Sequence, residues 1–314
     1  MRAPKLRAES LREAARLFGL DAADLALVNA GVNEVYRAPG VYLKFGPQEY
    51  FDGAKQLGAT SFLAHAFARG APVSEPLFSS SGNLIETVWQ DGETWQVTLA
   101  REVPGERLDP LNLTKEQVRA WGRALGQLHE AARSLVPPRG ALIKDFYRMW
   151  ADIEPVLARH DPALLPIHRE LTAWQATLPR DADVFGIIHG DTRAGNALWT
   201  GQNVTVIDFD EPCWHFFAGD LARPLLECGR IERAALLPHL LAGYREVRAL
   251  PTWLAHRLPN FIRERALIMY GWSLEGPPSG EAAHIGFDSA AGLNSSGARP
   301  YMRFLRRHLL RGDF

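Results

Sequence analysis

The first hundred residues combine short apolar, strand-like segments with two helical patterns. Strand-like segments cover 25–38, interrupted at Gly31, and 41–45, 84–90 and 93–102. The last two flank Asp91-Gly92, a pair that favours a tight hairpin turn. One helical pattern begins with a capping box at Ser10 and ends near Gly19, and the other covers 54–69 and is closed by Gly70. We therefore expect a mostly antiparallel sheet with a helix inserted into it.

Helical spacing dominates after residue 110. Thr114 and Gln117 form a second capping box, at the start of a helix with apolar residues at 118, 121, 125 and 128. Further helices are expected at 145–160, 165–178, 220–248, 252–274 and 298–311. The only strands expected in this part are short ones, at 185–188, 197–200 and 204–208. The glycine-rich segments 276–280 and 285–298 are expected to be surface connections.

The segment 103–109 separates these two patterns. Its proline and glycine break the preceding strand, which makes it the best candidate for a linker. The sequence therefore predicts an α+β protein with a sheet-rich lobe at 1–102, a hinge at 103–109 and a mainly helical lobe at 110–314. Ligands often bind at the interface between two such lobes.

Composition excludes several other classes of protein. The 314 residues carry a net charge of −1 without a basic run, so neither nucleic acid nor an anionic membrane is expected as a partner. The two cysteines, Cys213 and Cys228, do not form the spacing of a zinc site or a disulfide framework. Because no apolar run approaches about 18 residues, we expect a cytoplasmic protein. The sequence does not indicate an oligomeric state.

Five polar residues with potential chemistry lie within 188–211, in two short strands and the loops after them: His189, Asp191, Asn196, Asp208 and Asp210. The carboxylate of Asp191 could accept a proton from a substrate hydroxyl or orient that hydroxyl. Carboxylate and amide oxygens, as in Asn196 and Asp208, suit a hard cation such as Mg²⁺. Phosphoryl transfer depends on this kind of positioning and charge neutralisation.

A metal-dependent hydrolase is an alternative interpretation of the same segment. It would use His189, Asp191, Asp208 and the nearby His215. This interpretation is weaker because it leaves Asn196 without a role and does not explain the order of the two lobes.

The segment 185–226 resembles the catalytic and metal-binding loops of the aminoglycoside phosphotransferase and choline kinase-like family, which is related to protein kinases. That family has His-Gly-Asp, four residues and Asn, followed by Ile-Asp-Phe/Trp-Asp/Glu, as this chain does between 189 and 210. Weaker matches at 42–45, 71–76, 103–107 and 122–129 extend the resemblance over most of the chain. The resemblance implies a protein kinase-like, two-lobed fold with a small antiparallel-sheet N-terminal lobe and a larger, mainly helical C-terminal lobe.

The resemblance also implies roles for individual residues. Asp191 would be the catalytic base or the carboxylate that orients the hydroxyl, and Asn196 and Asp208 would hold Mg²⁺ on the nucleotide phosphates. Lys44 would contact the phosphates of ATP or GTP as a compact positive charge. His189 and Asp220 would support the catalytic loop.

The nucleotide would be covered by the turn at 29–36, where Gly31 and Asn33 are the candidate contacts. The backbone of the hinge would contact adenine, through Arg101, Glu102 and Val103.

The chain departs from the family pattern in two places. The family usually pairs its lysine with a Glu on the following helix, near Ala59 here, but 54–69 contains no acidic residue. Glu49 and Asp52 are candidates to replace that Glu. Many relatives have His-Pro or a similar pair where this chain has Arg193-Ala194, so Arg193 is either a substrate or phosphate contact or a solvated loop residue.

We therefore expect a phosphotransferase that transfers the γ-phosphoryl group of a nucleotide to a hydroxyl of a small molecule. An aminoglycoside-like compound, an amino alcohol, a sugar and an amino acid are all compatible acceptors. Acidic and aromatic residues that could bind a cationic acceptor are Asp145, Asp152, Glu154, Asp210, Glu211, Trp150, Trp214, Trp253, Tyr270 and Trp272. The alternatives are a Ser/Thr protein kinase of the bacterial stress-response type and a nucleotide-binding pseudokinase that acts as a sensor.

Overall fold

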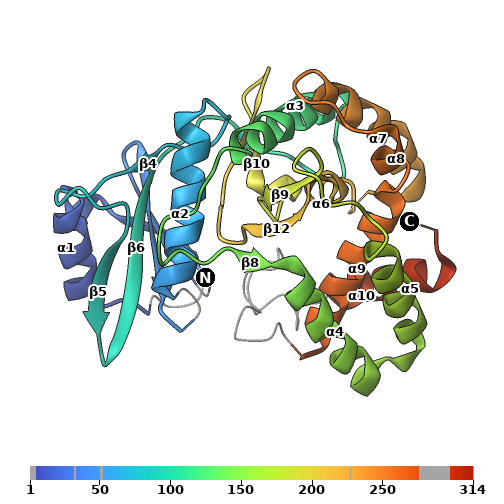
Figure 1. Ribbon diagram of the computed structural model, residues 1–314. Helices are drawn as coiled ribbons and strands as arrows, with labels where there is room; N and C mark the ends of the chain where they lie inside the picture. Colours follow the sequence, from blue (N-terminus) through green and yellow to red (C-terminus); the bar gives the residue numbers. More distant parts are fainter. Residues whose placement is uncertain (1–4, 32, 50–51, 227, 276–297, 314) are drawn as a thin grey trace.

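The computed structural model describes residues 5–31, 33–49, 52–226, 228–275 and 298–313. It consists of a sheet-rich N-terminal half and a mainly helical C-terminal half, as expected (Figure 1). The expected surface connections at 276–280 and 285–298 lie outside the described residues, except for residue 298, which begins a helix.

The N-terminal half is built on a six-stranded antiparallel sheet. Its strands are, in spatial order, β1 (Ala26–Ala30), β2 (Glu34–Ala38), β3 (Val41–Pro47), β6 (Glu93–Arg101) and β4 (Pro76–Leu77), with β5 (Glu86–Gln90) also paired to β6. The predicted hairpin is confirmed: Asp91 and Gly92 both have positive φ angles, 55° and 88°, as a type I′ turn requires. Lys44 lies in the middle of the sheet, opposite Val35 and Thr98.

Two helices accompany this sheet, α1 (Ala8–Leu17) and α2 (Gly53–Ala68). The predicted capping box at Ser10 is wrong, because α1 begins earlier, after Arg7. The Ser10 hydroxyl instead donates to the side chain of Gln90 at 3.1 Å, which ties the helix to β5. Helix α2 is capped by Asp52, whose carboxylate accepts hydrogen bonds from two backbone amides of the first turn.

The C-terminal half contains most of the helices. They are α3 (Lys115–Ala132), α4 (Phe146–His160), α5 (Leu165–Gln175), α6 (Phe217–Ala222), α7 (Arg230–Arg245), α8 (Thr252–Ala255), α9 (Leu258–Glu275) and α10 (Ala298–Arg311). Short 3₁₀ turns lie at Ala22–Asp24, Pro162–Leu164 and Ala194–Asn196. The capping box before α3 is confirmed: the Gln117 amide donates to the Thr114 hydroxyl, and the Thr114 amide donates to the Gln117 side chain.

Two predicted helices of this half are wrong in extent. The pattern at 220–248 is divided into α6 and α7, and the pattern at 252–274 is divided into α8 and α9. Pro224 cannot continue α6, because it lacks an amide hydrogen and its ring would clash with the carbonyl one turn earlier. Pro259 lies in the first turn of α9, where a missing amide hydrogen has no cost.

The structure also contains two three-stranded sheets, which lie among these helices. One contains β11 (Val204–Val206), β10 (Ala197–Trp199) and β7 (Glu106–Arg107), and the other contains β8 (Lys144–Asp145), β12 (Cys213–Phe216) and β9 (Phe185–Ile188). The expectation of only three strands after residue 110 is therefore wrong, since it missed β8 and β12. These two strands are defined by pairing rather than by a local pattern: β12 pairs with β9, and β8 pairs with β12.

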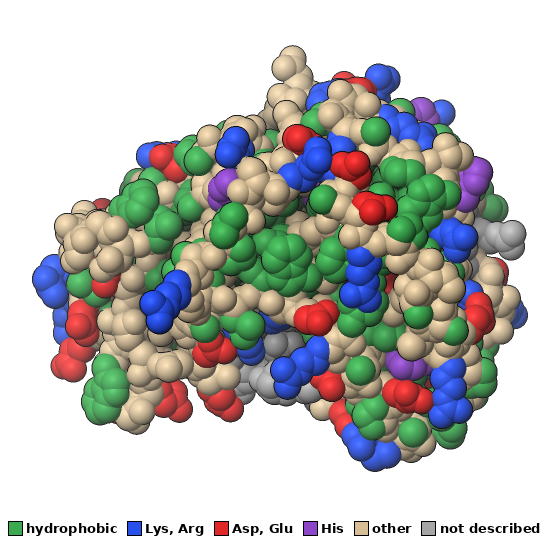
Figure 2. All heavy atoms as spheres, in the orientation of Figure 1, with side chains coloured by type: hydrophobic (Ala, Val, Ile, Leu, Met, Phe, Trp, Pro, Cys, Tyr) green, Lys and Arg blue, Asp and Glu red, His purple; other side chains and the backbone are tan. Residues whose placement is uncertain are grey.

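The hydrophobic core does not divide at the linker. A smaller cluster joins α1 to the N-terminal sheet, whereas the larger cluster of the C-terminal half also includes Phe62 and Ala66 of α2. Helix α2 thus packs toward the second half, and it stands between the two halves in Figure 1. Figure 2 shows hydrophobic side chains gathered across the middle of one face, between the halves. The lobe boundaries at 102 and 110 stay a prediction.

Within the described ranges, we find no helix with both the length and the hydrophobicity that crossing a bilayer requires. The cytoplasmic location stays a prediction.

Candidate active site

The loop between β9 and β10 holds Asp191 and Asn196 in contact with each other. The side-chain amide of Asn196 donates to the backbone carbonyl of Asp191 at 3.0 Å and to its carboxylate at 3.1 Å. Gly190 has a φ of 84°, and a Cβ at this position would collide with the carbonyl of Glu211. Only glycine fits this turn, because it allows a positive φ and a close approach of two backbones.

His189 is fully buried behind the loop. Its Nδ1 accepts a hydrogen bond from the amide of Asp191 at 3.2 Å, and its Nε2 lies 3.1 Å from the carbonyl of Ile207. Because Nδ1 accepts, Nε2 carries the proton and donates to that carbonyl. The ring therefore connects the Asp191 loop to the strand before Asp208, which supports the expected structural role.

Asp220 stabilises the same loop through hydrogen bonds to its backbone. Its carboxylate accepts from the amides of His189 and Gly190 at 2.8 and 2.9 Å, and from Nε2 of His129 at 3.0 Å. Burial alone would raise the pKa of Asp220, but the hydrogen bonds and the neighbouring histidines lower it. Burial lowers the pKa of His129, so the pair consists of a carboxylate and a neutral ring that also bonds the Tyr244 hydroxyl. This geometry supports the predicted bracing role of Asp220.

Lys44 connects the two halves at the site. Its ammonium lies 2.8 Å from the carboxylate of Asp208 and also pairs with Asp210. Burial alone would lower the pKa of Lys44, but the charges of the two carboxylates outweigh this effect and raise it.

Neither Glu49 nor Asp52 replaces the missing helix Glu, so that expectation is wrong. Asp52 caps α2, and Glu49 is exposed. The acidic partners of Lys44 come instead from the other half, more than 160 residues away.

Asp208 has an unusual backbone conformation, with a φ of 69°. Such left-handed geometry is uncommon for residues other than glycine and is often found at functional sites. Its side chain is 39% exposed, whereas that of Asp210 is 9% exposed. Asp208 is therefore the more accessible of the two carboxylates.

The expected Mg²⁺ ligands offer suitable atoms. The NH₂ group of Asn196 is used by Asp191, so the Oδ1 atom of Asn196 can act as a ligand together with the carboxylate of Asp208. An oxygen-only set of this kind fits Mg²⁺, which retains several waters and binds nucleotide phosphates. These residues therefore fit the ion that the family resemblance implies.

The hydrolase interpretation finds no such support. In the parts of the chain that the structure describes, no group of three or more His, Cys, Asp or Glu side chains is placed to hold a metal. His215, one of the four residues it required, pairs with buried Glu264 at 3.1 Å.

The predicted nucleotide contacts lie at two places. Asn33 contacts the acidic group around Lys44, because its side-chain amide donates to Asp210 at 3.0 Å. The backbone amide of Gly31 donates to the carbonyl of Asn33. The side chains of the predicted hinge are used elsewhere: Arg101 pairs with Glu75, and Glu102 binds Arg37 at 2.9 and 3.1 Å. The backbone amides at these two positions donate to the carbonyls of Glu75 and Gly40. The contact of the hinge backbone with adenine stays a prediction. The third hinge residue, Val103, is partly buried just beyond β6.

Three arginines surround the carboxylate of Asp191. They are Arg193 at 3.2 Å, Arg223 at 3.3 Å and Arg265 at 3.4 Å. Arg193 is thus neither free nor fully solvated. Arg223 and Arg265 were missed because they lie 32 and 74 residues away in sequence and no local spacing marks them.

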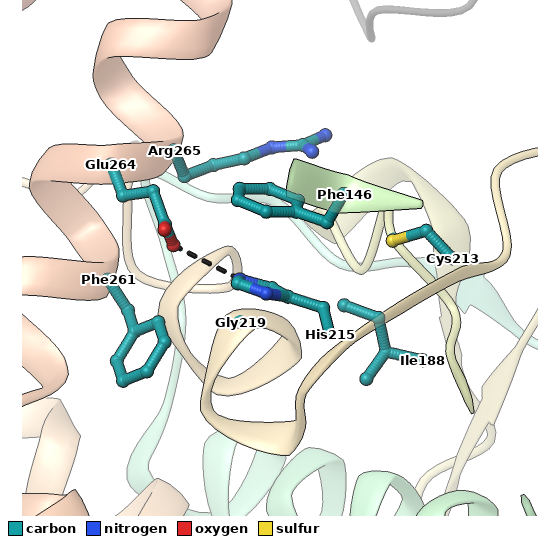
Figure 3. Close-up of a pocket in the computed structure, with 9 residues that line it drawn as sticks. Phe146, Ile188, Cys213, His215, Gly219, Phe261, Glu264 and Arg265 are labelled. Atoms are coloured by element: carbon teal, nitrogen blue, oxygen red, sulfur yellow. Dashed lines mark hydrogen bonds and ion pairs between the residues drawn. The ribbon is translucent and has the colours of Figure 1, made fainter. Parts of the chain in front are cut away.

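A small pocket lies between this loop and α9 (Figure 3). Phe146, His215 and Phe261 line it together with Gly190 of the catalytic loop. The His215 ring stacks on Phe146 with centroids 3.6 Å apart. Figure 3 shows Glu264 pointing to His215, while the neighbouring Arg265 extends past Phe146.

Comparison with known proteins agrees with this geometry. Residues 41–258 match the model of the phosphotransferase enzyme family. The chain belongs to that family. It is similar to an amicoumacin kinase of Bacillus subtilis (strain 168), with 25% identity over 235 residues and 68% of each chain covered.

Solved structures show the same fold. An amicoumacin kinase in complex with AMP-PNP, Ca²⁺ and Ami has a TM-score of 0.81 at 19% identity and covers 96% of this chain and 92% of that one. A microcompartment-associated aminopropanol kinase has a TM-score of 0.69 at 21% identity, with 98% and 99% covered. A spectinomycin phosphotransferase with ADP and spectinomycin has a TM-score of 0.65 at 15% identity, with 99% and 98% covered.

These findings confirm the predicted family and the predicted two-lobed α+β fold. They also confirm the prediction of a phosphotransferase that acts on a hydroxyl of a small molecule. The individual roles of Lys44, Asp191, Asn196 and Asp208 stay predictions.

Proposed function

We propose that this enzyme transfers the γ-phosphoryl group of ATP, with Mg²⁺, to a hydroxyl of a small molecule at the site around Asp191. One observation carries the proposal: candidate side chains from both halves meet at one site, where the amide of Ile207, next to Asp208, donates to the carbonyl of Asn196 at 3.0 Å. Asn196 bonds Asp191, and Lys44 bonds Asp208 at 2.8 Å across the two halves. These are the groups that phosphoryl transfer needs for positioning and charge neutralisation.

Each protein group has a distinct task in the reaction. Asp191 accepts a hydrogen bond from the acceptor hydroxyl and takes its proton as the oxygen attacks the γ-phosphorus. The new P–O bond forms while the bond to the β,γ-bridging oxygen breaks, and ADP leaves with that electron pair. Lys44 neutralises phosphate charge, and Asn196 and Asp208 would hold Mg²⁺. When bound, the ion would supply further charge stabilisation at the phosphate oxygens.

Two observations favour this proposal over its alternatives. A pseudokinase was suggested by the missing helix Glu, but Lys44 has two acidic partners from the C-terminal half. A protein kinase is less well supported because the relatives named above are kinases of amicoumacin, aminopropanol and spectinomycin.

The direct test is a transfer assay with the purified protein and γ-labelled ATP or GTP, with and without Mg²⁺. The panel contains aminoglycosides, amino alcohols, sugars, amino acids and a Ser/Thr-containing protein. We expect label on at least one small molecule, in the presence of Mg²⁺, with ADP formed in equal amount. Nucleotide binding without transfer to any member would support a sensor instead, and label on protein alone would support a protein kinase.

A further inference from the structure

The positive charge around Asp191 points to the chemistry of the acceptor. Arg193 comes from the catalytic loop, Arg223 follows α6, and Arg265 lies on α9, yet all three converge on one carboxylate. Arg193 contacts Oδ2, whereas the other two contact Oδ1. A single carboxylate does not need three guanidinium groups to be held in place, and the cluster carries more positive charge than Asp191 balances.

Arg193 and Arg265 are the members of this cluster that an incoming molecule could reach. Their side chains are 22% and 13% exposed, compared with 2% for Arg223. The buried Nε of Arg265 has no hydrogen-bond partner among the described residues. A guanidinium held at the edge of a site, with donors to spare, suits a planar anion such as a carboxylate.

The nearby acidic side chains are occupied by other cations or donors. Lys144 pairs with Glu211 at 2.7 Å, and Lys44 pairs with Asp208 and Asp210. Glu264, beside Arg265 in sequence, accepts from His215 at 3.1 Å and from Gln175. These acids are therefore not placed to neutralise Arg265 in place of a ligand.

Four of the ten residues expected to bind a cationic acceptor are engaged elsewhere. Asp145 caps α4, and Glu154 pairs with Arg169 at 3.0 Å. Trp150 is buried and stacks on His168, and the buried Tyr270 bonds Asp161. This arrangement offers neither an acidic patch nor an aromatic cage built from these four residues.

Helix α9 holds Arg265 in position. Glu264 fixes the helix to His215, whose ring is stacked on Phe146, and Arg265 extends from the same turn toward the catalytic loop (Figure 3). Its guanidinium lies 5.9 Å from the centre of the Trp272 ring. The side chain is thus anchored before an acceptor arrives, which lowers the entropy cost of binding.

We propose that the acceptor is a hydroxy acid, whose carboxylate is bound by Arg265 and Arg193 while its hydroxyl faces Asp191. This proposal rests on the function proposed above. Because Arg265 and Asp191 are 3.4 Å apart, the carboxylate and the reacting hydroxyl lie on the same or neighbouring carbons of a short chain. Hydroxy amino acids belong to this class. When the carboxylate takes the hydrogen bonds of the arginines, the carboxylate of Asp191 becomes available to the acceptor hydroxyl.

The test compares short hydroxy acids with their uncharged amides as acceptors: L-serine, glycerate and 3-hydroxybutyrate, each with Mg²⁺ and ATP. We expect kcat/KM to be at least tenfold higher for the acid than for its amide, the size expected for a charge-assisted hydrogen bond. Arg265→Gln should lower the ratio of kcat/KM for the acid to kcat/KM for the amide about tenfold or more, beyond any loss of activity that the two acceptors share. Arg265→Lys should restore part of the preference.

Arg263→Gln is the matched control, because Arg263 lies on the same helix but pairs with Glu170 at 2.9 and 3.1 Å. Equal use of acids and amides by the unaltered enzyme would overturn the proposal, as would an equal loss for both in Arg265→Gln. If Arg265→Gln does not fold, the comparison in the unaltered enzyme decides. If no acid is phosphorylated and calorimetry detects no binding of the acids in the presence of Mg²⁺ and AMP-PNP, the proposal also fails. Transfer to an uncharged acceptor would then still support the proposed function, whereas no transfer to any hydroxyl compound would contradict both.

Discussion

Lys44 shows at the scale of single residues what the sequence could predict and what it could not. The residues around Lys44 in the sequence were enough to predict that it lies on a strand and that it contacts phosphate. Its acidic partners come from the other half, 164 and 166 residues away, which local patterns do not reveal. The candidates at 188–211 were easier to find, because a single short segment carries Asp191, Asn196 and Asp208 together. Arg265 was missed, as the partners of Lys44 were, because it lies far from its partner Asp191 in the sequence.

Asp208→Asn is expected to weaken the Mg²⁺-dependent binding of nucleotide by roughly tenfold or more. An amide retains one oxygen but loses the charge that attracts the cation and that pairs with Lys44. Calorimetry with AMP-PNP, with and without Mg²⁺, measures the effect. Asp183→Asn is the control, because Asp183 is an exposed partner of Arg133 outside this network. The same dependence on Mg²⁺ in Asp208→Asn and in the unaltered enzyme would contradict the assignment.

At the scale of elements, periodicity predicted the existence of helices better than their ends. The helix at 115–132 was predicted well because its cap and its apolar positions agree. The helices predicted at 220–248 and 252–274 were each too long, because the apolar periodicity continues through Pro224 and Pro259 although the helix itself is interrupted near them. The packing of α3 against α7 could not be predicted from the sequence. It depends on Gly122 and Gly243, where a Cβ would collide with the backbone of the opposite helix.

Gly243→Ala is expected to lower the free energy of unfolding by about 1–3 kcal/mol, the usual cost of overpacking. The new methyl group would meet the carbonyl of Arg119, so α3 and α7 would have to separate. Denaturant unfolding measures the change. Gly53→Ala, at the first position of α2 with open space around it, provides the control. A Gly243→Ala protein as stable as this control would refute the close packing, since alanine alone favours a helix.

At the scale of the whole molecule, the two-lobed α+β fold was predicted correctly, whereas the boundary between the lobes near residue 103 stays a prediction. The packing of α2 toward the helical half was not predicted, because Phe62 and Ala66 are apolar on a helix that could face either side. Two buried histidines of the helical half, His129 and His168, also affect the molecule as a whole. Burial lowers the pKa of both rings from the ordinary value of 6.5.

The stability of the protein is therefore expected to fall as the pH falls below about 6.5. In this range the unfolded chain binds protons at His129 and His168 and the folded protein does not, so acid favours unfolding. Each histidine contributes up to about 1.4 kcal/mol per pH unit until its folded pKa is reached. The pKa of Asp220 is also lowered, but its contribution is lost only at a lower pH, below the ordinary carboxylate value.

Urea unfolding at pH 7.5 and 5.5 measures this dependence. His129→Gln should make it shallower than in the unaltered protein. Stability that stays constant or rises on acidification would show that these rings are protonated in the folded state.

The central claim is that Asp191 acts on the acceptor hydroxyl at a site assembled from both halves. The most direct test is the turnover of Asp191→Asn on the best acceptor of the transfer assay, together with its affinity for Mg²⁺ and AMP-PNP. We predict a loss of kcat of about 10²–10⁴, the usual effect of removing a general base, with nucleotide affinity nearly unchanged. Turnover equal to that of the unaltered enzyme would contradict the account.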